Sequence, residues 1–248
     1  MAASDQRKLI SASDPNALAS TAAGRLLARI GANGGRIAIC LSGGSSPKQL
    51  YALLASEPCR SKIPWDRVHW FIGDERFVPS GDPLHNMGVA RQIFLDQCAP
   101  RANIHPIPTD GASPDDDARR YERELKSFYG AERLDPAKPL FDFVLLGVGP
   151  DGHTASLFPL SPALEERVRW VVGVANVPVA PHVPRITLTF PALSSCREML
   201  FEVAGPDKRA ILTRVLAGEN LPANRAQSIG ETVMLADKGA LPEDVGGQ

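Results

Sequence analysis

The chain has 248 residues, a net charge of -1 and 44% hydrophobic residues, values typical of a globular protein with a substantial core. The near-neutral charge and the absence of a basic stripe argue against nucleic acid or an anionic membrane surface as a partner. No apolar run approaches the roughly 18 residues of a membrane span. The start, MAASDQRKLI, has no signal core, so we expect a cytoplasmic protein.

Neither the cysteines nor the histidines are spaced as metal ligands. The four cysteines form no C-x-x-C, and the five histidines form no H-E-x-x-H. We therefore expect no zinc site, no disulfide scaffold and no other metal. Cys40 lies in an apolar run and is expected to be a small buried hydrophobe.

The first elements are a helix and a buried strand. Ser13-Asp14-Pro15 predicts a helix start, and apolar residues at helical spacing continue to Ile30. Gly31 to Gly35 ends this helix, and residues 36–41 form a short apolar run that predicts a buried strand.

A glycine- and serine-rich loop follows this strand and precedes a helical pattern. Strand, glycine loop, proline and helix together favour an anion site, because backbone N–H groups, hydroxyls and a helix N-terminus converge there. The alternative is a plain N-capping turn. The pattern is not a Walker A loop, since G-x-x-x-x-G-K-[ST] is absent. The candidate ligands are Ser42, Gly43, Gly44, Ser45 and Ser46.

The next strand is predicted at 68–72, and charged residues follow it directly. Asp74 and Arg76 lie where a strand end in an α/β sheet binds ligands, although a solvated strand end also explains them. Beyond them we expect a helix at 86–95, an edge-like strand at 105–108 and a helix at 115–128. Glu122 and Lys126 form an i,i+4 pair on that helix, and its charge run is interpreted as a solvated face without function.

A glycine turn follows the apolar strand predicted at 143–148, and it contains three groups that can carry chemistry: Asp151, His153 and Thr154. His153 lies beside Asp151, and a histidine in such a turn can take a proton near neutral pH. The turn also matches G-x-G-x-x-G, but Pro150 lacks the N–H that a pyrophosphate needs. A purely structural tight turn is the other alternative.

Two cations follow later strands. We expect strands at 170–174, 185–190 (half-buried and alternating) and 199–204. Arg185 at the entrance of the second could be a surface charge. Lys208 lies in the first helical turn after the last strand, an unfavourable place for a cation unless an anion binds there. The residues after Gly239 are expected to fray.

These motifs match one known family in the same order. The segment GVGPDGHTASLFP resembles the signature of the 6-phosphogluconolactonase family, and LSGGSSPK, GDERFVP, HNMGVAR, PRITLT and the G-x-x-K at 205–208 resemble its other motifs. The resemblance runs from about Leu41 to about Leu212. It implies that Asp74 and Arg76 face the sugar and that Arg185 and Lys208 bind phosphate. Asn86 and Gly152 are also matched site residues, while His85 replaces the usual serine.

The resemblance implies a Rossmann-like fold shared with glucosamine-6-phosphate deaminases, which agrees with at least six strands alternating with helices. We expect a single three-layer α/β domain over residues 1–248 with a mainly parallel central sheet. The expected state is a monomer or weak homo-oligomer, without a cofactor.

The expected reaction is hydrolysis of 6-phosphoglucono-δ-lactone to 6-phosphogluconate. His153 would act as general base on water, with Asp74 or Asp151 orienting it. Arg76 or the backbone N–H groups of the glycine turn would stabilise the oxyanion. The alternatives are a related sugar-phosphate isomerase or deaminase, which needs carboxylates near the histidine, and a non-catalytic sugar-phosphate sensor.

Overall fold

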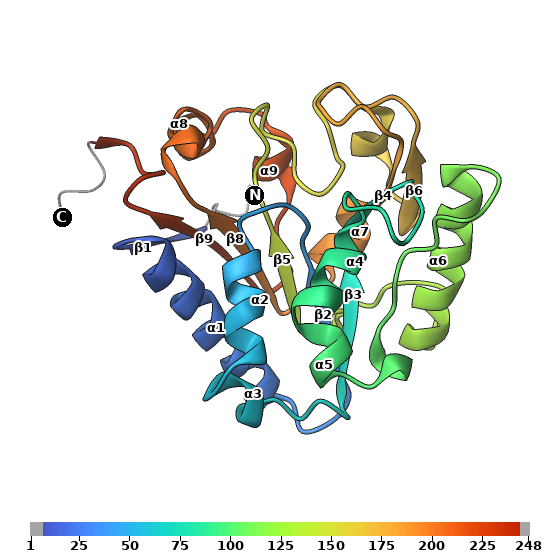
Figure 1. Ribbon diagram of the computed structural model, residues 1–248. Helices are drawn as coiled ribbons and strands as arrows, with labels where there is room; N and C mark the ends of the chain where they lie inside the picture. The colour runs from blue at the N-terminus through green and yellow to red at the C-terminus, as the bar shows by residue number, and fades with distance from the viewer. Residues whose placement is uncertain (1–6, 244–248) are drawn as a thin grey trace.

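A computed structural model describes residues 7–243, and its centre is a twisted parallel sheet (Figure 1). Within those residues the sheet has six strands in the order β1-β9-β8-β5-β2-β3, with every pairing parallel. All residues of β2, β5 and β8 are buried, so both faces of the sheet centre are covered. The expected α/β fold with a mainly parallel central sheet is confirmed. Its strands are β1 (Lys8–Ala12), β2 (Ile37–Leu41), β3 (Val68–Ile72), β5 (Phe143–Leu146), β8 (Glu198–Val203) and β9 (Glu231–Asp237).

A smaller antiparallel sheet lies beside the end of β3. It has the order β4-β7-β6, formed by β4 (Asp74–Arg76), β7 (Arg185–Leu188) and β6 (Val171–Val174). The expectation of a half-buried, alternating strand at 185–190 is wrong, because all four residues of β7 are buried. The reason is that β7 is the central strand of this sheet and helix α6 (Pro114–Tyr129) packs against it.

Helices cover the sheets, and the main ones agree with the sequence patterns. The Asp14 side chain accepts a hydrogen bond from Ala17 N at 2.9 Å and caps the first helix as expected. Within residues 7–243, no helix is long and apolar enough to cross a membrane. The helices are α1 (Pro15–Ala32), α2 (Lys48–Ala55), α3 (Cys59–Lys62), α4 (Asn86–Ala90), the π-helical turn η1 (Arg91–Leu95), α5 (Asp96–Cys98), η2 (Arg101–Asn103), α6 (Pro114–Tyr129), η3 (Pro162–Glu165), α7 (Phe190–Ser194), η4 (Pro206–Lys208), α8 (Arg209–Leu216) and α9 (Pro222–Arg225).

Two further sequence expectations differ from the structure, and two strands were not predicted. Residues 105–108 form no strand, because Pro106 and Pro108 cannot donate to a ladder and the chain joins β3 through a single bridge at Ile104. Strands β1 and β9 were missed. Because β9 lies inside the sheet, the chain beyond Gly239 is partly anchored, and Ala240 and Leu241 are buried rather than frayed. Residues 244–248 lie outside the described part.

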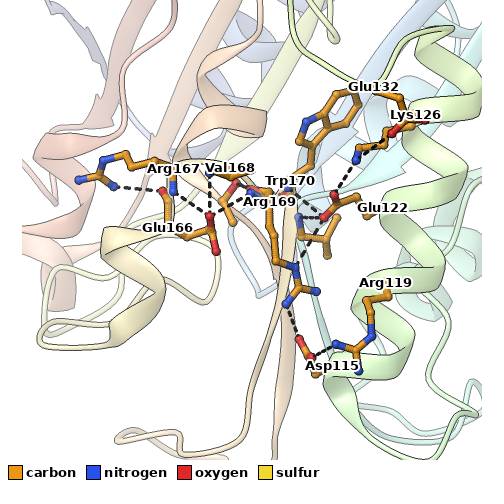
Figure 2. Close-up of polar contacts among 12 residues, drawn as sticks. Asp115, Arg119, Glu122, Lys126, Glu132, Glu166, Arg167, Val168, Arg169 and Trp170 are labelled. Carbon is orange, nitrogen blue, oxygen red and sulfur yellow. Dashed lines mark hydrogen bonds and ion pairs between the residues drawn. The ribbon is translucent and has the colours of Figure 1, made fainter.

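The charge run on α6 joins this helix to the small sheet (Figure 2). Glu122 and Lys126 form the expected pair at 3.0 Å. The same Glu122 carboxylate accepts a hydrogen bond from the backbone N–H of Trp170 at 3.1 Å, and Arg169 bonds Asp115 at 2.7 Å. The run is therefore more than a solvated face, since it fixes α6 against the start of β6.

Close packing between α6 and β6 gives the first testable prediction. A Cβ on Gly173 would lie 2.6 Å from the backbone nitrogen of Asp115, so Gly173→Ala must push α6 away. We expect a loss of about 1–3 kcal/mol in the free energy of unfolding, measured by urea denaturation. The matched control is Gly24→Ala on the exposed side of α1, where a Cβ meets no atom within 4 Å and should stabilise by about 0.4–1 kcal/mol. Equal effects of the two substitutions would contradict this packing.

Candidate active site

Neighbouring strands of the parallel sheet end around one cavity of about 220 Å³. In the sheet, β3 lies next to β2 on one side, and β5, which comes later in the chain, lies next to β2 on the other side. The carboxyl ends of β2 and β5 therefore mark the switch point where α/β sheets bind ligands. Most of the residues predicted from sequence line this cavity: Ser42, Gly43, Gly44, Ser45, Ser46, Asp74, Arg76, Asn86, His153, Arg185 and Lys208.

The turn after β5 holds His153 through its own backbone. The N–H of Gly149 donates to the carbonyl of His153 at 2.8 Å, and Gly152 adopts a φ of +85° that closes the turn. A Cβ on Gly149 would overlap the imidazole, and the Phe158 ring centroid lies 4.6 Å from the imidazole centroid. The imidazole therefore packs against both a glycine and an aromatic ring.

Asp151 lies behind the histidine rather than in the cavity lining. Its Oδ1 is 2.5 Å from His153 Nδ1 and also accepts the His153 backbone N–H at 3.1 Å. Burial opposes ionisation of this carboxyl, but the hydrogen bond and charge of His153 outweigh it, and the pKa of Asp151 is lowered. The sequence left open which aspartate contacts the histidine, and in the structure it is Asp151. Gly152 also lies behind the cavity, where a Cβ would press on Leu221.

Asp74 has a different partner. It is buried, and its Oδ2 accepts a hydrogen bond from the Ser156 hydroxyl at 2.6 Å. The backbone N–H of Ser156 in turn donates to the Thr187 hydroxyl of β7 at 3.2 Å. Asp74 is thus tied to the loop that follows His153, without contacting the imidazole directly.

Asn86 packs against the glycine-rich loop. Its side-chain amide donates to the carbonyl of Asp74 at 3.0 Å, and its side chain occupies the space where a Cβ of Gly43 would lie. A side chain at position 43 is therefore excluded, whatever the backbone angles. At the start of the loop, the Tyr51 hydroxyl donates to the Ser42 carbonyl at 2.6 Å and accepts the Ser42 N–H at 3.1 Å.

Glu75 binds the backbone of the segment that leads to Asn86. This fully buried carboxylate accepts backbone N–H groups from Arg76, Asn86 and Met87 at 2.6–2.9 Å. Burial raises the pKa of Glu75 to about 7, although these three donors favour the charged form. The sequence interpretation gave Glu75 no role. The structure shows that it holds the segment between β4 and α4 in place.

Two arginines lie next to each other on adjacent strands of the small sheet. Arg76 and Arg185 are register partners in the β4–β7 pair. Arg185 is only 3% exposed, and its Nε and Nη1 have no hydrogen-bond partner, while its Nη2 donates to Pro181 O at 2.8 Å. Burial and then the charge of Arg76 lower the pKa of Arg185. The buried guanidinium nitrogens without a hydrogen-bond partner, Nε of Arg76 and Nε and Nη1 of Arg185, form a site that an anion would stabilise.

Lys208 brings a third cation to the cavity. It ends η4 after β8, and its Nζ donates to the carbonyl of Val148 at 3.0 Å, next to the glycine turn. The exits of β5 and β8 are therefore joined by this side chain. The three cations of the cavity, Arg76, Arg185 and Lys208, come from three different strand ends.

Two polar residues of the cavity were missed by sequence reasoning. Ser156 lies within the TASLFP segment and was given no role, although Thr154 of the same segment was considered. Glu202 interrupts the apolar strand MLFEV and lines the cavity while buried. A charged residue inside an otherwise apolar run was the available signal.

Among the described residues, no group of three His, Cys, Asp or Glu side chains could hold a metal ion.

A cavity at the switch point of a parallel sheet, lined by a histidine, carboxylates and several cations, is typical of α/β proteins that bind small anionic ligands. A family model described as glucosamine-6-phosphate isomerases/6-phosphogluconolactonase matches residues 13–234. The chain is 43% identical over 211 residues to a 6-phosphogluconolactonase of Synechocystis sp., covering 83% of this chain and 84% of the relative.

Solved structures of the same kind of protein are also similar to this chain. The 6-phosphogluconolactonase from Trypanosoma cruzi superposes with a TM-score of 0.83 at 29% identity, covering 96% of this chain and 97% of that one. A monomeric glucosamine-6-phosphate deaminase has a TM-score of 0.77 at 19% identity, covering 94% and 98%, which shows a shared fold. The chain belongs to the glucosamine-6-phosphate isomerase/6-phosphogluconolactonase family.

The confinement of His153 gives the second prediction. Gly149→Ala should displace the imidazole and break its hydrogen bond to Asp151, because the new methyl group overlaps the ring. Imidazole proton and nitrogen shifts measured by NMR should then change, with loss of the ring-current effect of Phe158. In Gly147→Ala, where a Cβ meets nothing within 4 Å, the His153 signals should stay at their wild-type positions. Unchanged His153 signals in Gly149→Ala would show that the ring is not held this way.

Proposed function

We propose that the chain hydrolyses 6-phosphoglucono-δ-lactone to 6-phosphogluconate, the second step of the oxidative pentose phosphate pathway. The observation that carries the proposal is the pairing of His153 with Asp151 on a cavity that also contains Arg185 and Lys208. One part of such a site transfers a proton, and the other binds a phosphate. The names of the relatives support the same substrate.

In this proposal His153 is the general base. Asp151 occupies Nδ1, which leaves Nε2 as the nitrogen that takes a proton from the attacking water. The Asp151 carboxylate also stabilises the imidazolium that forms. General-base assistance contributes roughly 10²–10⁴-fold, which suits a lactone that already opens spontaneously. No G-x-S-x-G nucleophile elbow occurs in the sequence, so direct attack by water is favoured over an acyl-enzyme.

The oxyanion needs a donor next to the carbonyl carbon. Arg76 lines the cavity with an unpartnered Nε, while its Nη1 is fixed by the carbonyl of Leu84 at 2.8 Å. A side chain anchored at one nitrogen and free at another can serve as a preorganised donor. Asp74, held by Ser156, is left to accept a sugar hydroxyl. We assign orientation of His153 to Asp151 rather than to Asp74.

The phosphate is assigned to Arg185, Lys208 and the Ser42–Ser46 loop. Each charge-assisted hydrogen bond is worth about 1.5–3 kcal/mol, so two cations and several backbone or hydroxyl donors suffice to anchor a small sugar phosphate. The cytoplasmic location, the single-domain organisation and the monomer or weak homo-oligomer remain predictions.

The related isomerase or deaminase is less well supported. It needs a carboxylate that works beside the histidine, whereas the residues after His153, TASLFP, contain none. Asp74 is held by Ser156, and Asp151 is bonded to Nδ1.

The decisive assay for lactone hydrolysis uses a pH-stat and freshly prepared phosphorylated lactone, corrected for spontaneous ring opening.

The third prediction tests the general base. His153→Ala should lower kcat by about 10²–10⁴-fold, because the proton acceptor is lost, while 6-phosphogluconate still binds with nearly wild-type affinity. A non-catalytic sensor would show no enzymatic turnover even in the wild type. Turnover that survives the substitution would remove His153 from the mechanism.

The fourth prediction tests the phosphate anchors. Lys208→Ala and Arg185→Ala should each raise KM about 10- to 100-fold with a smaller change in kcat, because a contact present throughout the reaction contributes mainly to binding. Arg209→Ala is the matched control, since this neighbouring cation bonds Gly239 O and Glu243 outside the cavity. Equal kcat/KM for the phosphorylated and unphosphorylated lactones in the wild type would refute the phosphate assignment.

A further inference from the structure

Glu202 is a buried acid for which the proposed reaction has no use. It lies on β8, on the same face as Glu198, because side chains alternate along a strand. Glu198 is 2% exposed and is paired with Arg25 and Arg29 of α1. Glu202 is equally buried, yet neither of its carboxyl oxygens has a hydrogen-bond partner. One strand face thus carries a paired acid at one end and an unpaired acid at the other.

The unpaired acid lies at the wall of the cavity, beside the glycine- and serine-rich loop. Glu202 lines the cavity together with Ser42 and Lys208. Neither of two polar groups of this region bonds to it: the Tyr51 hydroxyl donates to the Ser42 carbonyl, and Lys208 Nζ donates to Val148 O. Its register partner on β9 is the apolar Leu235.

An acid in this position is held in its neutral form. Burial raises the pKa of Glu202 to about 8, and no hydrogen bond or ion pair opposes this shift. A neutral carboxylic acid has one O–H donor. A buried donor without an acceptor is costly, so this geometry favours a ligand that supplies the acceptor.

We propose that Glu202 is an additional phosphate ligand of this site, donating its carboxylic O–H to a phosphate oxygen of the bound sugar phosphate. The inference rests on the proposed function, because it uses the phosphate end assigned there. A phosphate oxygen is a strong acceptor, and the hydrogen bond would satisfy the donor that the protein leaves unpaired. The proton stays on Glu202, and no covalent bond changes.

Binding is then linked to one proton. Above the pKa of Glu202 the carboxylate would repel the phosphate dianion, so the acid must be protonated before the ligand binds. Tyr51 on α2 interacts electrostatically with Glu202, and Asp74, Arg76, His153, Arg185 and Lys208 line the same cavity, while α1 directs Arg25 and Arg29 to Glu198. Tyr51 has a raised pKa because of its burial, so it stays neutral over the range considered.

The test is calorimetric binding of 6-phosphogluconate between pH 7 and pH 9. For the wild type, Kd should rise about tenfold for each pH unit above about 8, the slope expected for one required proton. Glu202→Gln keeps the shape and the donor but cannot ionise, so its Kd should stay nearly constant over the same range. The control Glu198→Gln, on the same strand face but away from the cavity, should follow the wild-type curve.

The outcomes separate this inference from the proposed function. If the wild type and Glu202→Gln bind with the same pH dependence, the role of Glu202 is refuted and the phosphate site stands. If the wild type does not bind 6-phosphogluconate, both fail.

Thermal unfolding provides a second readout. Because the folded-state pKa of Glu202 lies above its usual value, its contribution to stability is lost as pH rises from about 4.5 to about 8. The Tm of Glu202→Gln should therefore match the wild type near pH 5 and exceed it at pH 8.5. Should that variant fail to fold, calorimetry of the wild type at pH 8.5 in buffers of different ionisation enthalpy should detect uptake of roughly half a proton or more per ligand. No uptake would overturn the inference.

Discussion

The parallel pairing of β8, β5 and β2 is the constraint on which the rest of the structure depends. These adjacent strands end at one edge of the sheet, and each is followed by a segment that contributes to the cavity. The glycine-rich loop comes from β2, the histidine turn from β5 and Lys208 from the segment after β8. A shift in this register would separate the parts of the site, since each loop is placed by the strand that precedes it.

The small antiparallel sheet contributes Asp74, Arg76 and Arg185 to the cavity. It places the half-buried Arg76 beside the buried Arg185 and holds Asp74 against the loop after His153 through Ser156. Buried charges without full pairing cost stability. Arg185 has two unpartnered nitrogens, and Glu202 has two unpartnered oxygens. The cavity thus contains unsatisfied guanidinium N–H donors and an unsatisfied carboxylic acid, and a phosphate ligand would relieve both.

Local patterns predicted much of this arrangement. The buried strands predicted at 68–72 and 143–148, the helix start at 13–15 and the gathering of the glycine loop, Asp74, Arg76 and His153 at strand ends all follow from apolar runs broken by turn residues, although the second strand ends at Leu146. Contacts across the chain could not be predicted in this way. The choice of Asp151 as partner of His153, the Ser156–Asp74 bond and the burial of β7 depend on how distant segments pack, and the isolated acid at Glu202 was overlooked.

The central claim is that one small ligand spans the cavity from the cations to the imidazole. A crystal structure with bound 6-phosphogluconate tests it most directly. We expect the phosphate within hydrogen-bond distance, about 2.7–3.2 Å, of Arg185 and Lys208, with the C1 carboxylate facing His153 Nε2. A ligand bound in the opposite direction, or outside this cavity, would contradict the account.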